Sequence, residues 1–175
     1  MSLPLEISLP PGGDMRGSFC IEEIPREAGL VIFGASGDLT SSKLVPALFS
    51  LHRKNRLPRG FFLVGCARSA FQESAWRASL AAALRPQAPS EEVLSGFLQR
   101  CFYLGGDYRD PGLYARLASR LQELDRRLRG QANHVFYLAT PPDLYQPVVE
   151  GLAAAGLARD RPEATARAIF EKPFG

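Results

Sequence analysis

The chain has 175 residues, of which 46% are hydrophobic, a size and composition typical of one globular domain. Its formal net charge of +3 suits an anionic small molecule and does not indicate nucleic acid binding. Three scattered cysteines exclude a disulfide framework or a zinc site, and no apolar run is long enough to cross a membrane, so we expect a cytoplasmic protein without a metal.

Residues 1–27 are predicted to form a flexible N-terminal tail. They lack the basic start and the compact apolar stretch of a signal peptide, and Pro10, Pro11, Gly12 and Gly13 interrupt any regular pattern. We therefore expect one folded domain over residues 28–175, with no linker that divides it.

Beyond the tail, short apolar runs alternate with segments of helical periodicity. In chain order we expect a strand at 30–33, a helix at 44–51, a strand at 61–64, helices at 73–84 and 90–99, a strand at 101–104, a helix at 110–130, a strand at 134–139, a helix at 143–156 and a strand at 166–170. The first two strands are expected to end at Gly34 and Gly65. Continuous apolar strands joined by helices predict an α/β fold, with a Rossmann-like doubly wound parallel sheet.

The first helix carries a clear apolar pattern. Leu44, Leu48 and Leu51 recur at helical spacing, with Val45 and Phe49 beside them. This spacing predicts an amphipathic helix that carries these residues on its apolar side.

Caps and a second stripe mark the later helices. Ser90, Asp110 and Asp143 each stand where a helix is expected to begin, and their side chains can accept hydrogen bonds from free backbone amides. Pro111 suits the first position of the helix after Asp110, and Gly130 suits its end. The apolar stripe of this helix consists of Leu113, Leu117, Leu121, Leu124 and Leu128.

The segment between the first strand and the first helix carries the main functional signal. It reads Gly34, Ala35, Ser36, Gly37, Asp38, Leu39, Thr40 and Ser41. Small residues here let the backbone approach a pyrophosphate, the helix N-terminus supplies free N–H groups, and the hydroxyl groups can add donors. The glycines follow the spacing G-x-x-G rather than G-x-G-x-x-G, so a simple strand-to-helix turn stays open as the alternative. No lysine follows a glycine, which excludes a P-loop ATPase.

The end of the second strand indicates which dinucleotide binds. In a dinucleotide-binding fold, an acid at this position binds the ribose 2′-hydroxyl of NAD, whereas an arginine accommodates the 2′-phosphate of NADP. The sequence offers Arg68 and Ser69 here, with no acid nearby. The alternative is that Arg68 is a solvated loop residue without a ligand. Its position at the end of the second strand favours binding to the 2′-phosphate of NADP.

Five motifs, in this order, resemble the beginning of the glucose-6-phosphate dehydrogenase family. They are GASGDL at 34–39, KLVPALF at 43–49, GCARS at 65–69, YLATPP at 137–142 and EKPFG at 171–175. The resemblance covers residues 30–175 and implies an NADP-dependent oxidoreductase. Members of this family oxidise glucose 6-phosphate at C1 to 6-phosphogluconolactone and pass the hydride to NADP, in the pentose phosphate pathway.

The resemblance also implies roles for individual residues. The loop 34–41 would hold the pyrophosphate and Arg68 the 2′-phosphate, while Tyr145 would lie near the cofactor. Lys172 matches the family's lysine that contacts both substrate and cofactor, and it is the candidate catalytic residue. Its place after the strand 166–170 suits this role, because ligands bind at the carboxyl ends of parallel strands and an ammonium group stabilises negative charge as the C1 hydroxyl loses its proton.

Oxidation at C1 also needs a general base. The only histidines, His52 and His134, are predicted to lie away from the carboxyl ends of the strands, and we expect structural roles for both. The resemblance implies a C-terminal domain that supplies the base, the substrate wall and the interface of a homodimer or tetramer. We therefore expect little or no dehydrogenase activity from this chain alone.

Two alternatives to a dehydrogenase stay open, a non-catalytic NADP-binding or sensing module and a pseudoenzyme. The absence of a Tyr-x-x-x-Lys pair argues against a short-chain reductase.

Overall fold

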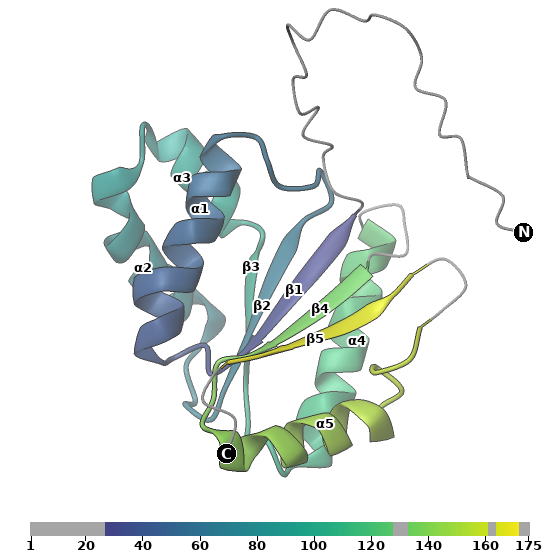
Figure 1. Cartoon of the computed structure of the whole chain (residues 1–175). Coiled ribbons are helices and arrows are strands. Elements are labelled where there is room, and N and C mark those ends of the chain that lie inside the picture. The colour runs from purple at the N-terminus through teal and green to yellow at the C-terminus, as the bar shows by residue number, and fades with distance from the viewer. Residues whose placement is uncertain (1–26, 128–132, 161–163, 172–175) are drawn as a thin grey trace, which may run out of the picture.

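The computed structural model describes residues 27–127, 133–160 and 164–171. At its centre is one sheet of parallel strands in the order β3-β2-β1-β4-β5. The strands are β1 (Ala28–Phe33), β2 (Phe62–Ala67), β3 (Cys101–Gly105), β4 (Asn133–Leu138) and β5 (Ala166–Phe170). The chain runs from β1 outward to β3 and then returns to the other side of β1 for β4 and β5, so the predicted doubly wound α/β fold is confirmed (Figure 1).

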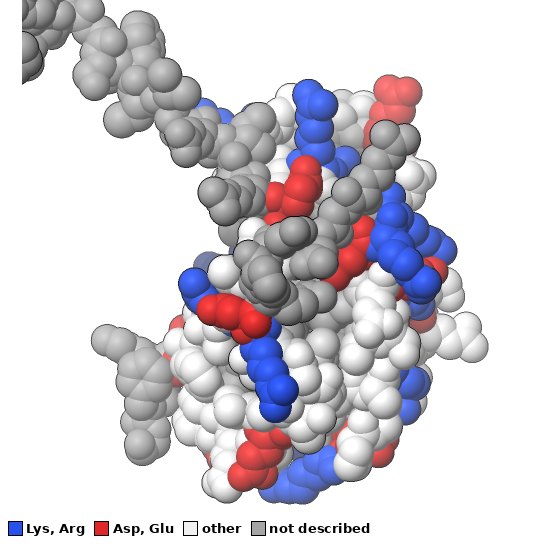
Figure 2. Space-filling model, turned by 90° about the vertical axis from the view of Figure 1, so that its right-hand side faces the viewer, with Lys and Arg blue, Asp and Glu red and all other residues white. Residues whose placement is uncertain are grey.

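Helices cover both faces of the sheet, with α1, α2 and α3 on one face and α4 and α5 on the other (Figure 1). Their bounds are α1 (Val45–Arg53), α2 (Glu73–Leu84), α3 (Glu91–Leu98), α4 (Pro111–Arg127) and α5 (Tyr145–Ala154). Within the described part of the chain, none of them has the length and apolar character that a membrane span needs. Side chains of β1 alternate between the two cores: Val31 and Phe33 pack with α4 and α5, and Ile32 packs with the first three helices. Figure 2 shows the side of α4 and α5, where uncharged side chains cover much of the lower half.

β2 extends further than the sequence pattern predicts. The strand runs from Phe62 to Ala67, so the expectation that it ends at Gly65 is wrong. A Cβ at Gly65 would lie 2.7 Å from the Trp76 ring and 2.8 Å from the Ala35 Cβ. Glycine is needed here to let α2 and the loop after β1 approach the sheet, and it does not mark the strand's end.

The first helix buries its predicted apolar residues with one exception, because Leu44 and Leu48 pack against the core that contains Val45 and Phe49, and Leu51 does not. Leu51 is 42% exposed, whereas Val45 and Phe49 are buried. A π-helical turn, Thr40–Leu44, precedes α1. Pro46, the second residue of α1, has no amide to donate and its ring crowds the carbonyl one turn earlier, which favours a wider turn.

Two of the three predicted caps are confirmed. The Ser90 hydroxyl accepts a hydrogen bond from the backbone amide three residues on at 3.3 Å, and Asp110 Oδ1 accepts one from Gly112 N at 2.8 Å. Asp143 does not cap α5, because it lies inside a 3-10 turn, Pro142–Leu144, that precedes the helix. The apolar stripe of α4 is buried as expected at Leu113, Leu117, Leu121 and Leu124.

Some predictions lie outside the described residues, namely the tail before residue 27 and the end of α4 at Leu128 and Gly130. Glu27, which the sequence pattern assigns to the tail, is bound to the domain. Its carbonyl accepts a hydrogen bond from Asn133 N at 2.9 Å, and its carboxylate accepts one from the amide of Gly60. The domain therefore includes this residue as well as β1.

Candidate functional site

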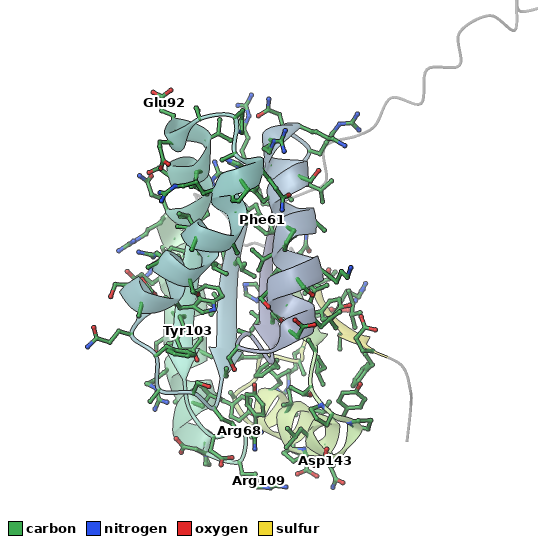
Figure 3. The ribbon with its side chains drawn as sticks, turned by 90° about the vertical axis from the view of Figure 1, so that its left-hand side faces the viewer. Phe61, Arg68, Glu92, Tyr103, Arg109 and Asp143 are labelled. Carbon is green, nitrogen blue, oxygen red and sulfur yellow. The ribbon has the colours of Figure 1, made fainter. Side chains whose placement is uncertain are left out.

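The carboxyl ends of the parallel strands lie at one edge of the sheet, where the loops that follow them converge. Figure 3 shows Arg68, Arg109 and Asp143 at this edge and Phe61 and Glu92 toward the opposite end of the domain. In doubly wound folds, ligands bind at this edge where the strand order reverses. Here the reversal lies between β1 and β4, so the loop after β1 borders the expected binding crevice.

Gly34 begins the glycine loop, residues 34–41, in a conformation that glycine adopts most readily. Its φ is +91°, and a Cβ at this position would lie 2.2 Å from the backbone oxygen of Ala139. Its amide and that of Ala35 donate to the Cys66 carbonyl at 2.9 and 3.1 Å. The start of the loop is thus held between the ends of β4 and β2.

Hydrogen bonds within the glycine loop set its shape. Gly37 N donates to the Gly34 carbonyl at 2.9 Å, and the Thr40 hydroxyl donates to the same oxygen at 3.0 Å. Thr40 is buried, so its hydroxyl closes the loop instead of facing solvent. The Ser41 hydroxyl donates to the Gly37 carbonyl at 3.2 Å. The side chains that stay exposed on the loop are those of Ser36, Asp38, Leu39 and Ser41.

The helix after the glycine loop directs its N-terminus to this edge. It continues from the π-helical turn Thr40–Leu44 directly into α1. Amides in the first turn of a helix have no acceptor within the helix, and the aligned peptide dipoles leave a partial positive charge there. A small-residue loop that leads into such a helix is suited to bind a phosphate.

The loop after β2 lies against the glycine loop. The Ser69 hydroxyl donates to that of Ser36 at 3.4 Å, and the Ser69 carbonyl accepts a hydrogen bond from Tyr103 Oη at 2.7 Å. Arg68 is exposed, and none of the ion pairs in the described part of the chain involves it. The planar guanidinium is therefore available to an anion that reaches across the two loops.

Tyr145 lies beside the carboxyl end of β5. Its hydroxyl donates to the Glu171 backbone oxygen at 2.7 Å, and its ring meets that of Phe170 edge-on with the centroids 5.2 Å apart. The Tyr137 hydroxyl donates to the Glu171 carboxylate, and burial together with this hydrogen bond raises the pKa of Tyr137 to about 12. Lys172 lies outside the described residues. The structure thus brings Tyr145 to the residue that precedes Lys172.

Two aromatic residues that support the glycine loop give no signal in the sequence pattern. Trp76 of α2 packs on the loop, with its Nε1 3.4 Å from the Ala35 carbonyl oxygen. Tyr108, in the irregular segment before α4, accepts a hydrogen bond from Gly34 N at 2.8 Å and donates one to the Cys66 carbonyl at 3.1 Å. A lone aromatic residue has no periodicity from which such contacts could be predicted.

The two histidines lie away from this edge, as expected. His52 is near the end of α1, where its ring packs against Phe97 with the centroids 5.5 Å apart, and burial together with the charge of Arg100 lowers its pKa. His134 is buried at the start of β4, with Nε2 3.2 Å from Asp125 Oδ1. Neither imidazole is placed to act as a base at the carboxyl ends of the strands.

The described residues show neither a cluster of metal ligands nor a reactive thiol. In the ranges that the structure describes, no group of three potential metal ligands occurs. Cys66 and Cys101 are free and buried, and burial raises the pKa of each thiol to about 12. Both are therefore protonated at neutral pH and pack as small apolar side chains.

Comparison with known proteins relates this geometry to a family. Residues 31–175 match the family described as glucose-6-phosphate dehydrogenase, NAD binding domain. Glucose-6-phosphate 1-dehydrogenase of Treponema pallidum (strain Nichols) is 41% identical over 150 residues, which are 83% of this chain and 29% of that protein. That of Aggregatibacter actinomycetemcomitans is 38% identical over 147 residues, which are 83% of this chain and 30% of that protein.

Solved structures agree with the sequence comparison. The crystal structure of glucose-6-phosphate 1-dehydrogenase from Mycobacterium avium has a TM-score of 0.71 and 31% identity, covering 85% of this chain and 30% of that chain. A glucose-6-phosphate dehydrogenase in complex with its substrate glucose-6-phosphate has a TM-score of 0.76 and 29% identity, covering 86% of this chain and 32% of that chain. The chain therefore spans about a third of the length of the relatives that it matches.

Proposed function

Because this chain belongs to the glucose-6-phosphate dehydrogenase family, we propose that it binds NADP at the carboxyl edge of its sheet, as the dinucleotide-binding part of an enzyme that oxidises glucose 6-phosphate to 6-phosphogluconolactone. The observation that carries this proposal is the contact between two loops. Ser69 Oγ lies 3.4 Å from Ser36 Oγ, so the loop that carries the exposed Arg68 contacts the glycine loop. The free, buried thiols of Cys66 and Cys101 support a reducing compartment, the cytoplasm.

The pyrophosphate would lie on the glycine loop, residues 34–41. The amides of Gly34 and Ala35 donate to the Cys66 carbonyl, so the donors for phosphate would be the amides nearer the helix and the Ser36 hydroxyl. The exposed Ser41 hydroxyl would join them by turning away from the Gly37 carbonyl. The partial positive charge of the helix N-terminus would stabilise the phosphate oxygens.

Arg68 would select the phosphorylated dinucleotide. A guanidinium group offers two parallel donors to a phosphate, and Ser69 offers a hydroxyl next to it. The six residues of β2 and the pair that follows, 62–69, include no acid that could instead bind the 2′-hydroxyl of NAD. We therefore infer a preference for NADP.

Lys172 would act where the nicotinamide and the sugar meet. NADP, when bound, accepts the hydride from C1 of the sugar. The Lys172 ammonium group would donate hydrogen bonds to the sugar hydroxyls and stabilise the negative charge on O1 as its proton leaves. The Tyr145 hydroxyl, which donates to the Glu171 carbonyl, would fix the backbone that leads into Lys172.

Calorimetric titration of the chain with NADP⁺ and with NAD⁺ tests the cofactor assignment. We expect NADP⁺ to bind more tightly, and Arg68→Ala to weaken NADP⁺ binding by about 10- to 100-fold because charge-assisted hydrogen bonds are lost, with little change for NAD⁺. Arg85→Ala is the matched control, because Arg85 is also an exposed arginine and pairs with Glu91 far from the site. No binding of NADP⁺, or an equal effect of both substitutions, would falsify the assignment.

A spectrophotometric assay tests the chain's own activity. The described histidines are not placed to take the O1 proton, so we expect the chain to bind NADP⁺ but to form little or no NADPH with glucose 6-phosphate. Substantial NADPH formation would show that a base for this proton lies within residues 1–175.

A further inference from the structure

Tyr108 touches both of the loops that would contact the dinucleotide. It lies between β3 and α4, and its side chain is 3% exposed. Its hydroxyl accepts a hydrogen bond from Gly34 N at 2.8 Å and donates one to the Cys66 carbonyl at 3.1 Å. Gly34 begins the glycine loop, and Cys66 lies two residues before Arg68. A single phenol group therefore links the starts of the two loops.

The position of Tyr108 is itself fixed by its neighbours. Tyr114 Oη donates to the Tyr108 carbonyl at 2.7 Å and to the Pro147 carbonyl at 3.3 Å. The Phe33 ring meets the Tyr108 ring edge-on, with the centroids 5.6 Å apart and an interplanar angle of 77°. Because both backbone and ring are held, the hydroxyl acts as a fixed point for Gly34 and Cys66.

The hydroxyl is protonated under ordinary conditions. Burial raises the pKa of Tyr108 to about 12, although the amide of Gly34 and the positive charge of Arg68 oppose this effect. The phenol can therefore donate to the Cys66 carbonyl while it accepts from Gly34 N.

The fold does not need this hydroxyl to satisfy the backbone. Gly34 N and the Cys66 carbonyl also bond to each other directly at 2.9 Å. Loss of the phenol oxygen would leave both groups with a partner, so no buried polar atom would be orphaned. The hydroxyl instead adds a third point of attachment, which keeps the start of the glycine loop from shifting against the end of β2.

We propose that Tyr108 is a positioning residue, which sets the spacing between the glycine loop and Arg68 and thereby strengthens the preference for NADP over NAD. This inference rests on the function proposed above. NADP would contact both loops at once, whereas NAD has no 2′-phosphate for Arg68. A change in the spacing would therefore weaken NADP more than NAD, because charge-assisted hydrogen bonds depend on close geometry.

Substitution of Tyr108→Phe tests this inference in the whole chain. Calorimetry with NADP⁺ and NAD⁺ gives the ratio of the two affinities, which we expect to fall about threefold to tenfold in the variant, the effect of one lost hydrogen bond. Circular dichroism and urea unfolding should show that the variant is folded. The ratio is the decisive readout, because a loss of stability alone weakens both dinucleotides equally.

Tyr114→Phe provides the control. It removes a hydroxyl from the same aromatic cluster, one that bonds to the carbonyls of Tyr108 and Pro147 rather than to either loop. We expect lower stability and a smaller fall in the affinity ratio than in Tyr108→Phe, because this hydroxyl acts on the loops through the backbone of Tyr108. The inference is overturned if the ratio of the NADP⁺ and NAD⁺ affinities is unchanged in Tyr108→Phe, or if it falls equally in both variants. It is also overturned if the Tyr108→Phe chain does not fold. A wild-type chain that binds neither dinucleotide overturns the proposed function and the inference with it.

Discussion

Gly34 takes a positive φ of +91° where the chain leaves β1, and a neighbouring carbonyl blocks any side chain there. That carbonyl belongs to Ala139, whose amide bonds to Phe33 as an extension of the pairing between β4 and β1. Backbone held in this way cannot move aside as the tip of a flexible side chain can. Conformational strain and steric contact therefore act on the same position.

We expect Gly34→Ala to lower the free energy of unfolding by at least about 2 kcal/mol, since both effects apply. Gly156→Ala is the matched control, because Gly156 has a φ of +70° but no atom within 4 Å of the added Cβ. There only the backbone term of about 1–2 kcal/mol applies. Urea unfolding followed by circular dichroism measures both, and equal losses would mean that the contact with Ala139 costs nothing.

Sequence position alone locates much of the candidate site. The glycine loop and Arg68 can be found because each follows a strand that the apolar pattern predicts, although the second strand was expected to end too early. Tyr108 cannot be found in this way, because its role depends on a contact with Gly34, 74 residues away. The inward turn of the Thr40 hydroxyl is equally invisible, since it depends on the shape of the loop that the hydroxyl closes.

Among the elements, those with a continuous or strictly periodic apolar pattern were the most predictable. The leucine stripe of α4 is confirmed because its residues are buried, and the five strands are confirmed as members of one parallel sheet, although β5 is mostly exposed. On α1 the predicted apolar residues contact the core except Leu51, which is 42% exposed. The π-helical turn Thr40–Leu44 that precedes this helix could not be predicted, because an apolar pattern does not distinguish it from an α-helical turn.

A pair of leucine substitutions tests this assignment of faces. Leu117 of α4 is fully buried, and we expect Leu117→Ala to lower the free energy of unfolding by about 2–5 kcal/mol through lost contacts and the cavity left behind. Leu51 of α1 is 42% exposed, so Leu51→Ala should cost less than about 1 kcal/mol. The measurement is urea unfolding of both variants, and similar costs would mean that Leu51 is buried after all.

For the molecule as a whole, the free side of β5 is the most exposed part of the sheet. In the described residues β5 pairs only with β4, and its side chains from Arg167 to Phe170 are exposed. Ile169 and Phe170 place apolar surface at this edge, with 43% and 38% of each exposed. An edge strand with apolar side chains pairs readily with another chain.

We therefore expect the chain to self-associate as its concentration rises, and Ile169→Lys to reduce this association because a charge at the edge opposes strand pairing. Size-exclusion chromatography with light scattering gives the mass at each concentration. Leu51→Lys is the control, since it introduces the same charge at a similarly exposed apolar residue on a helix rather than on an edge strand. If both substitutions act alike, general charge rather than the β5 edge controls the association.

The chain contains a single tryptophan, Trp76, whose indole is 97% shielded and lies against the carbonyl of Ala35. The intrinsic fluorescence of the chain's only indole therefore comes from a site that lies both next to the glycine loop and inside the core. Trp76 fluorescence can therefore report both ligand binding at the glycine loop and unfolding of the domain. No dye or tag needs to be attached to the protein.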